Sequence, residues 1–411
     1  ILSSDEIIDL YNSTKERIKK ISEDVIHLPK ITESSEIKKS IIECRRPRAL
    51  PPQVENSQRA ELFGRDFDKL NSVPQHMAKL INYGLTDILL RYKNALVFGE
   101  DVAQKGGVYN VTDSLAKRFG PRRVFNSILD ETSILGNAIG FAHNGLLPIP
   151  EIQFLAYVHN AEDQIRGEAA TLAFFSQGQF TNPMVIRVAG LAYQKGFGGH
   201  FHNDNSLAIF RDIPGLIVAV PSNGADAVKM LRTCVRMAET KGRVVVFIEP
   251  IALYMTKDLH QEGDKEWSFT YPEIVEEIEV GEFGTYGEGE DVLIITYGNG
   301  YFYSRQAEKE LREKLQVKCK LIDLRWISPI DWDKLIQVVD QYKKVLIVEE
   351  CRKTGSLSEG LVAGIVERAK CIPKIKVVAA DDSFIPLGVA AAAGLPKKAE
   401  VIAGVLELLK K

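Results

Sequence analysis

The sequence predicts an α/β protein made of two parallel-sheet domains, preceded by a helical arm and a linker. Three observations lead to this prediction: short β-rich runs alternate with helix-like segments after Pro74, a second series of the same kind begins at Val292, and the chain before Pro74 lacks such alternation. Alternating strands and helices are typical of parallel sheets covered by helices. The 411 residues, 45% of them hydrophobic, are enough for each domain to bury its own core.

The chain is expected to begin with an amphipathic helix. Apolar residues recur close to helical spacing from Ile7 to Val25, and Ser3 and Glu6 have the spacing of a capping box. The stretch from Glu43 to Gln58 contains three prolines and no periodicity, which is typical of an extended linker. We therefore assign residues 1–72 to a helical arm and linker. Because the first residue is not Met and opens a helix, we expect the chain to be one segment of a longer polypeptide.

The first α/β domain is expected at residues 73–265 and the second at residues 275–411, with the junction near residues 263–278. The strand candidates of the first are ALVFGED (95–101), RVFNSI (123–128), LPIPEIQF (147–154), MVIRVA (184–189), GLIVAVP (215–221) and VVVFIEP (244–250). Those of the second are VLIITYG (292–298), CKLIDLR (319–325), KVLIVEE (344–350) and IKVVAA (375–380), with helices expected at residues 304–315 and 358–369.

Composition argues against several classes of protein. With 52 basic and 55 acidic side chains and a formal charge of -3, the chain has no excess of positive charge for nucleic acid or an anionic membrane. Its longest apolar stretches, such as VLIITYG, are far shorter than the roughly 20 residues of a membrane helix. The five cysteines are scattered and form no Cys-x-x-Cys pair, so we expect neither a disulfide framework nor a zinc site, and a reducing cytoplasm fits best.

The common phosphate-binding and hydrolase motifs are missing. The sequence has no Gly-Lys pair and hence no P-loop, and the glycines of GEFGTYGEGED do not fit the dinucleotide pattern and precede a strand. No Gly-x-Ser-x-Gly elbow is present either. Nucleotide-binding and serine-hydrolase mechanisms therefore lose support.

Three segments in the first domain carry the strongest functional signal. They are VFGEDVAQKGGVYNVT (97–112), EIQFLAYVHNAEDQI (151–165) and GFGGHFHND (196–204). In this order and spacing they resemble the β subunit of thiamine-diphosphate-dependent 2-oxoacid dehydrogenases, and the resemblance continues through DLRWISPID to cover about residues 75–411. It implies the transketolase-like fold, with a pyrimidine-binding domain followed by a C-terminal domain. The arm resembles the tail of the family's α subunit, as in a fused α/β chain.

The resemblance assigns a catalytic role to Glu131. In the family, a glutamate at this place hydrogen-bonds the aminopyrimidine of thiamine diphosphate, and a carboxyl group that shares its proton with that ring helps to remove the thiazolium proton. The sequence ILDE is one residue longer than the usual pattern, so Asp130 stays an alternative. Without the motif, Glu131 would be interpreted as a surface residue at the start of the next helix.

Further site residues follow from the same resemblance. Tyr157 matches the aromatic residue that stacks on the aminopyrimidine, and Gln153 lies among residues near the cofactor. His202, with His200 as the less certain choice, matches the histidine that lines the substrate channel and assists acyl transfer to lipoamide. After this histidine the family more often has Ser-Gln or Ser-Asp, whereas this chain has Asn203 and Asp204.

The cofactor site is expected to be incomplete. Thiamine-diphosphate enzymes hold the diphosphate through Mg²⁺ on a Gly-Asp-Gly sequence, and this chain has no Asp-Gly pair, so no metal ligand is assigned here. The resemblance places those ligands on an α-type half and implies a lipoyl acyltransferase core as a second partner, in a two-plus-two tetramer or a fused homodimer. A potassium site is conceivable at residues 181–185.

The expected activity is oxidative decarboxylation of pyruvate or a branched-chain 2-oxoacid. Two alternatives stay open: carbon transfer like that of transketolase or deoxyxylulose-phosphate synthase, and a non-catalytic assembly subunit. Joint retention of Glu131, Tyr157 and His202 argues against the latter. The preferred oxoacid does not follow from this sequence.

Overall fold

The computed structural model describes residues 2–42, 44–194 and 197–410, which form two compact units at residues 1–40 and 41–411. In the first unit, helix α1 (Ser4–Val25) begins with the predicted capping box: the Ser3 N–H donates to Glu6 Oε2 at 2.7 Å, and the Glu6 N–H donates to Ser3 Oγ at 3.3 Å. Its apolar side chains, including Ile7, Tyr11 and Ile18, are exposed. The amphipathic helix is therefore confirmed.

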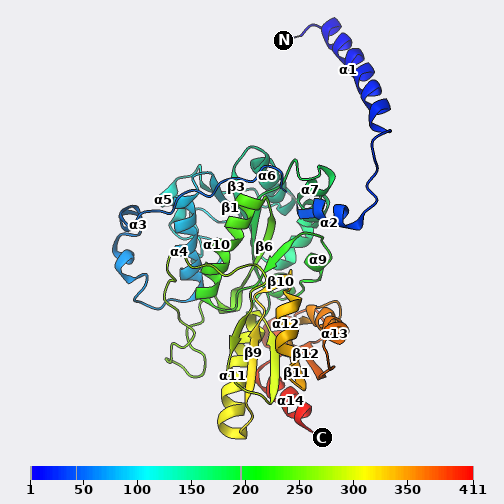
Figure 1. Ribbon diagram of the computed structural model, residues 1–411. Helices are drawn as coiled ribbons and strands as arrows, with labels where there is room; N and C mark the ends of the chain where they lie inside the picture. Colours follow the sequence, from blue (N-terminus) through cyan, green and yellow to red (C-terminus); the bar gives the residue numbers. More distant parts are fainter. Residues whose placement is uncertain (1, 43, 195–196, 411) are drawn as a thin grey trace. The chain divides into compact units, whose positions relative to one another are not determined.

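The second unit contains the two sheets (Figure 1). Every predicted strand is present. The first sheet has the order β10-β5-β6-β4-β3-β1-β2 and is parallel except for β10. Its strands are β1 (Ala95–Gly99), β2 (Val124–Asn126), β3 (Leu147–Ile152), β4 (Met184–Gly190), β5 (Ile217–Ala219), β6 (Val244–Pro250) and β10 (Trp326–Ser328). All residues of β4 and β6 are buried, as expected for central strands covered on both faces.

Alternation along the strands sends side chains to two cores. Val97 packs with helices α4 (Met77–Arg91) and α10 (Gly224–Lys241), whereas its neighbour Phe98 packs with helix α6 (Glu131–His143). These helices therefore cover opposite faces of the first sheet. Helix α2 (Ser34–Ile42) spans the boundary between the two units. The shorter elements of the region around the first sheet are α3 (Asn56–Phe63), η1 (Gly64–Lys69), η2 (Val108–Asn110), α5 (Leu115–Phe119), η3 (Leu155–Ala161), η4 (Gln164–Ala169), α7 (Leu172–Phe175), α8 (His200–Asn203), α9 (Ala208–Arg211) and η5 (Ile251–Leu253).

The second sheet has the order β12-β11-β8-β9-β7 and is parallel except for β7. Its strands are β7 (Gly284–Tyr286), β8 (Val292–Thr296), β9 (Cys319–Asp323), β11 (Lys344–Arg352) and β12 (Lys374–Ala380). Its helices are α11 (Gly298–Leu315), α12 (Trp332–Val339), α13 (Leu357–Arg368) and α14 (Lys398–Leu409), with the short η6 (Gly388–Ala392) before the last.

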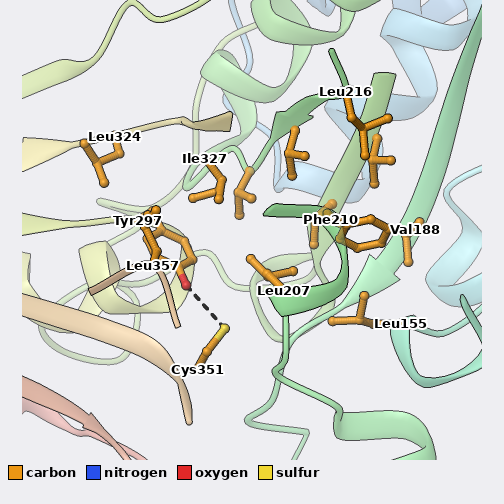
Figure 2. Close-up of a cluster of buried hydrophobic side chains, with 14 of the residues drawn as sticks. Leu155, Val188, Leu207, Phe210, Leu216, Tyr297, Leu324, Ile327, Cys351 and Leu357 are labelled. Atoms are coloured by element: carbon orange, nitrogen blue, oxygen red, sulfur yellow. Dashed lines mark hydrogen bonds between the residues drawn. The ribbon is translucent and has the colours of Figure 1, made fainter. Parts of the chain in front are cut away.

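One of these two cores, the one that contains Phe98, is shared by the two sheets. Leu155, Val188 and Phe210 of the first α/β region belong to the same buried cluster as Leu324 and Leu357 of the second (Figure 2). In this cluster the Tyr297 hydroxyl lies 3.3 Å from Cys351 Sγ. Strand β10 crosses from the second region to pair with β5 of the first sheet. Large apolar contact and a shared strand fix the first sheet against the second.

Several elements were not predicted, among them β7, β10 and α3. Strands β7 and β10 have three residues each, too few to show a period of two, so the glycine cluster around β7 and the motif DLRWISPID gave no strand signal. Helix α3 begins at Asn56, so the last three residues of the predicted linker are helical. Tertiary contacts anchor this helix: Arg59 forms two hydrogen bonds to Asp87, at 2.9 and 3.1 Å, and the Tyr271 hydroxyl donates to the same carboxylate. Among the helices of the described residues, none has the length and apolar character that a membrane span requires.

Candidate functional site

The predicted site residues, together with Glu100, follow the carboxyl ends of four adjacent strands, β4, β3, β1 and β2. Glu131 comes after β2, Gln153 and Tyr157 come after β3, and His202 comes after β4. Glu100 directly follows β1 between them. Because carboxyl ends of neighbouring parallel strands meet at one edge of the sheet, residues up to 102 positions apart in sequence gather there.

Glu131 is the first residue of α6 and is buried, with 7% of its surface exposed. Its Oε2 accepts a hydrogen bond from the Asn160 side-chain amide at 3.2 Å, and the Thr132 hydroxyl donates to the carbonyl of the same asparagine at 2.5 Å. These bonds tie the start of α6 to η3. The carboxyl group is thus held at a fixed place and partly desolvated, as an acid-base group requires.

Asp130, the alternative to Glu131, has a structural role. It is the N-cap of α6, and its Oδ2 accepts the Ser133 N–H at 2.9 Å. A carboxylate that satisfies the first turn of a helix stabilises that helix by about 1 kcal/mol. This geometry favours Glu131 over Asp130 as the group that faces a ligand.

Two residues of the second motif share one face because the chain forms a 3₁₀-helix there. In η3, with about three residues per turn, Tyr157 and Asn160 lie one above another, and Phe154 is the N-cap that precedes them. The Phe154 and Tyr157 rings contact each other edge-to-face, with their centroids 5.8 Å apart. Burial, followed by the negative charges of Glu100 and Glu131, raises the pKa of the Tyr157 hydroxyl. Tyr157 and Glu131 are therefore neighbours.

His202 is half-buried in a cage of aromatic rings. Its centroid lies 4.3 Å from that of Phe154, 5.0 Å from that of Phe197 and 6.3 Å from that of Tyr157. Nδ1 lies 3.2 Å from the Gly198 carbonyl oxygen, which can only accept, so we assign the proton of the neutral ring to Nδ1. In that tautomer Nε2 carries the lone pair of the ring.

A glycine makes this position of His202 attainable. Gly198 has φ +70°, and a Cβ atom there would lie 1.9 Å from His202 Nδ1. Any side chain would therefore displace the imidazole as well as strain the backbone. His200 points elsewhere: its ring contacts Phe201 and Phe384, at 4.1 and 5.1 Å.

The structure thus brings Glu131, Tyr157 and His202 together. Gln153 is half-buried at the end of β3, and within the described residues no hydrogen bond or ring contact joins its side chain to the other three. Sequence reasoning missed Phe154, Asn160 and Glu100. The first two stand in a quoted motif at spacing three from Tyr157, which becomes informative only once the segment is known to be a 3₁₀-helix.

Glu100 adds a second acid beside Glu131. Burial, followed by the charges of Asp101 and Glu131, raises the pKa of its carboxyl group, while Lys105 lowers it. Lys105 itself is 2.5 Å from Asp101. Glu100 therefore adds an acidic side chain to the edge of the sheet where Glu131 lies.

A buried ion network lies under the site. Arg187 on β4 donates to both oxygens of Glu249 on β6, at 2.7 and 2.8 Å, and to Glu151 on β3 at 2.6 Å. The Tyr254 hydroxyl donates to Glu249 as well, at 2.5 Å. The network joins β3 and β4, whose ends lead into the site, to the neighbouring strand β6.

Comparisons with known proteins agree with this geometry. Residues 74–255 match the family described as "Transketolase, pyrimidine binding domain", and residues 281–387 match "Transketolase, C-terminal domain". The chain is 34% identical over 333 residues to the "Pyruvate dehydrogenase E1 component subunit beta" of Bacillus subtilis, covering 79% of this chain and 96% of that protein. The protein of the same name in Staphylococcus aureus is 34% identical over 341 residues, covering 81% and 98%.

A solved structure shares the fold. It is described as "Split gene transketolase, inactive beta4 tetramer", and it superposes with a TM-score of 0.63 at 21% identity, covering 82% of this chain and 98% of that one. The likeness extends over both sheets.

Proposed function

Because the chain belongs to the family of 2-oxoacid dehydrogenase E1 β subunits, we propose that it is the β-type half of an enzyme that decarboxylates a 2-oxoacid and transfers the acyl group to a lipoyl group. The observation that carries the proposal is the convergence of Glu131, Tyr157 and His202 at the ends of adjacent parallel strands. The substrate is pyruvate or a branched-chain 2-oxoacid.

The described residues fit thiamine diphosphate, the cofactor of this family. Glu131 offers a buried carboxyl group of which only Oε2 is bonded, to Asn160, and Tyr157 offers a half-buried ring beside it. A carboxyl group and an aromatic face are what an aminopyrimidine needs for one hydrogen bond and for stacking. When bound, thiamine diphosphate supplies the nucleophilic carbon and accepts the electron pair left by CO₂.

Each residue then has a separate role. Glu131 shares a proton with the pyrimidine, Tyr157 stacks on it, and Gln153 lies near the ring. His202 faces the incoming lipoyl disulfide. In the overall reaction the oxoacid loses CO₂, one lipoyl sulfur takes the acyl group and the other takes a proton, so that the disulfide is the oxidant. His202 Nε2, after taking up a proton from solvent to give the imidazolium, would supply that proton.

The other half of the site comes from an α-type half. This chain contains no Asp-Gly pair, so the Mg²⁺ that binds the diphosphate needs ligands from a second chain or domain. We place the contact at an apolar rim formed by Phe197, Phe201, Phe384 and Leu387, which are 55–71% exposed. Phe197 contacts His202, so an α-type half that reaches the cofactor must cover this rim. A two-plus-two tetramer or fused homodimer, docked on a lipoyl acyltransferase core, fits this arrangement.

Residues 181–185 offer one feature that suits a potassium ion and one that opposes it. Asn182 Oδ1 is buried without a hydrogen-bond partner, which suits a cation, and its amide donates to the Glu168 and Ala169 carbonyls. Arg243 opposes a further cation, since it lines the same cavity and donates to the Gly215 carbonyl at 2.5 Å. Thermal unfolding in KCl, NaCl and choline chloride at equal ionic strength tests the site, because a bound ion raises the melting temperature.

The function is tested by reconstituting the chain with its α-type half and assaying 2-oxoacids in parallel with sugar phosphates. We expect CO₂ release from pyruvate or a branched-chain oxoacid, and acylation of a lipoyl domain. Turnover of sugar phosphates alone would support the transketolase or deoxyxylulose-phosphate synthase alternative. Assembly with the α-type half and the acyltransferase without any turnover would identify an assembly subunit.

A further inference from the structure

Two segments beside the site have backbone conformations that need support. Tyr109 and Asn110, in the loop after β1, have φ of 53° and 61°, and Leu191 and Tyr193, after β4, have φ of 71° and 76°. Non-glycine residues in this region cost roughly 1–3 kcal/mol each and persist only where neighbouring contacts hold them. Both segments border His202, so the contacts that hold them bear on its position.

Gln194 is the residue through which the two segments meet. Its backbone N–H donates to Asn203 Oδ1 at 2.9 Å, and its side-chain amide donates to the His202 carbonyl. The other polar atom of its side chain, Oε1, accepts a hydrogen bond from the Tyr109 hydroxyl at 3.3 Å. With only 9% of its surface exposed, Gln194 thus contacts both the residue that carries the imidazole and the residue after it.

The segment that carries His202 is closed on itself. The side-chain amide of fully buried Asn203 donates to the carbonyls of Phe197 and Gly199, at 2.6 and 2.9 Å. Together with the close approach of Gly198 to the imidazole, this makes residues 197–203 a compact hydrogen-bonded turn. Gln194 is bonded to this turn at two points, the Asn203 side chain and the His202 carbonyl.

Tyr109 is itself fixed to a rigid support. Its ring lies 6.0 Å from that of fully buried Tyr254, whose hydroxyl is bonded to Glu249 of the ion network under the sheet. A continuous series of contacts therefore runs from the buried network through Tyr254, Tyr109 and Gln194 to the backbone of His202. No part of this series needs Tyr109 to contact substrate.

We propose that Tyr109 and Gln194 are positioning residues that hold His202 in register with the incoming acyl acceptor. This proposal rests on the acyl-transfer function proposed above. The hydroxyl of Tyr109 orients the Gln194 carboxamide, and the oriented carboxamide fixes the His202 carbonyl and hence the direction of Nε2. Misplacement by a fraction of an ångström slows proton transfer, whereas binding of the oxoacid depends on other groups.

The experiment uses the reconstituted complex and two assays: acylation of a free lipoyl domain, which needs His202, and oxoacid-dependent reduction of ferricyanide, which bypasses the lipoyl group. We expect Tyr109→Phe to lower kcat for lipoyl acylation by about two- to tenfold, the loss expected for one neutral hydrogen bond. Ferricyanide reduction, the KM for the oxoacid and the melting temperature should stay near their wild-type values. Tyr342→Phe is the matched control, because it removes a hydroxyl bonded to the Gly289 carbonyl in the second α/β region.

A double-mutant cycle separates positioning from direct contact. In the Gln194→Ala background the acceptor of the Tyr109 hydroxyl is gone, so adding Tyr109→Phe should change acylation by less than about twofold. Full additivity of the two changes, or equal losses in both assays, would overturn the proposal. His202→Asn tests the underlying function: if it leaves acylation intact, the proposed role of His202 fails, whereas a loss there with normal Tyr109→Phe and Gln194→Ala enzymes refutes only the positioning role.

Discussion

Replacement of Arg187 by Met tests whether the buried ion network supports the strands that carry the site. Arg187 is 1% exposed and makes two hydrogen bonds to Glu249 and one to Glu151, all between 2.6 and 2.8 Å. Glu151 is the register partner of Arg187 across β3 and β4. The Met side chain fills most of the volume but leaves two buried carboxyl groups without a cation.

The expected loss is large. Removing one partner of a buried ion pair typically costs about 3–5 kcal/mol, roughly a fifth or more of the about 5–15 kcal/mol that stabilises a domain. Burial already raises the pKa of Glu151, and Arg187 opposes that rise. In the variant this carboxyl therefore has a pKa well above its unfolded value, so its penalty is absent below the unfolded pKa and grows as the pH rises. The variant should recover stability, relative to the wild type, as the pH falls from 7.5 to 5.

Urea unfolding followed by circular dichroism at several pH values measures this loss. Adding Glu249→Gln to Arg187→Met should restore part of the stability, since one of the two unpaired acids is then neutral. A single variant within about 1 kcal/mol of the wild type at pH 7.5, or one that loses further stability relative to the wild type in acid, would refute the reasoning.

Three further predictions concern cofactor, partner and pH. The chain without an α-type half should bind thiamine diphosphate weakly or not at all in calorimetry, because the Mg²⁺ ligands are missing; micromolar Mg²⁺-dependent binding would contradict the shared site. Light scattering should find no stable monomer at micromolar concentration, and a monomer that recruits no α chain would contradict the pairing. The exposed Phe384 tests the contact surface: Phe384→Asp should weaken binding of the α-type half at least about tenfold. Val366→Asp on α13, the control, should leave this binding unchanged. Burial raises the pKa of Asp323 to about 7 and of Glu350 to about 8, so their contribution to stability is complete near pH 4 and is lost as the pH rises through 7 and 8. Asp323→Asn should flatten the decline in melting temperature between pH 6 and 8, and an unchanged decline would contradict the assignment.

Much of the fold could be predicted because its strands are long and apolar. Runs such as Val244–Pro250 and Val292–Thr296 are buried throughout, so composition alone identifies them. The sharing of one sheet by β10 and β5 could not be predicted, since a three-residue strand is defined by its partner rather than by its own pattern. The same limit applies to α3, whose position depends on the contact of Arg59 with Asp87.

For the site, the order of the motifs predicted which residues form it, whereas the structure shows how those residues contact one another. The sequence left Glu131 and Asp130 as alternatives, and the N-cap bond of Asp130 supports the choice of Glu131, which stays a prediction. It likewise left His200 as a second candidate beside His202. Of these two rings, the structure shows that of His202 in contact with Tyr157. Gln194 carried no signal, because its side-chain bonds join loops that are distant in sequence. The roles of the site residues stay predictions until they are tested.

The most direct test of the central claim is cofactor proton exchange in the reconstituted complex of Glu131→Gln. The amide keeps the shape of the carboxyl group but cannot share its proton, so we expect exchange of the thiazolium proton and turnover to slow by at least roughly a hundredfold, with folding intact. Asp130→Asn is the control, and its exchange should stay close to that of the wild type. Loss of exchange in Asp130→Asn with normal exchange in Glu131→Gln would move the acid to Asp130, and normal exchange in both variants would contradict the proposed thiamine-diphosphate site.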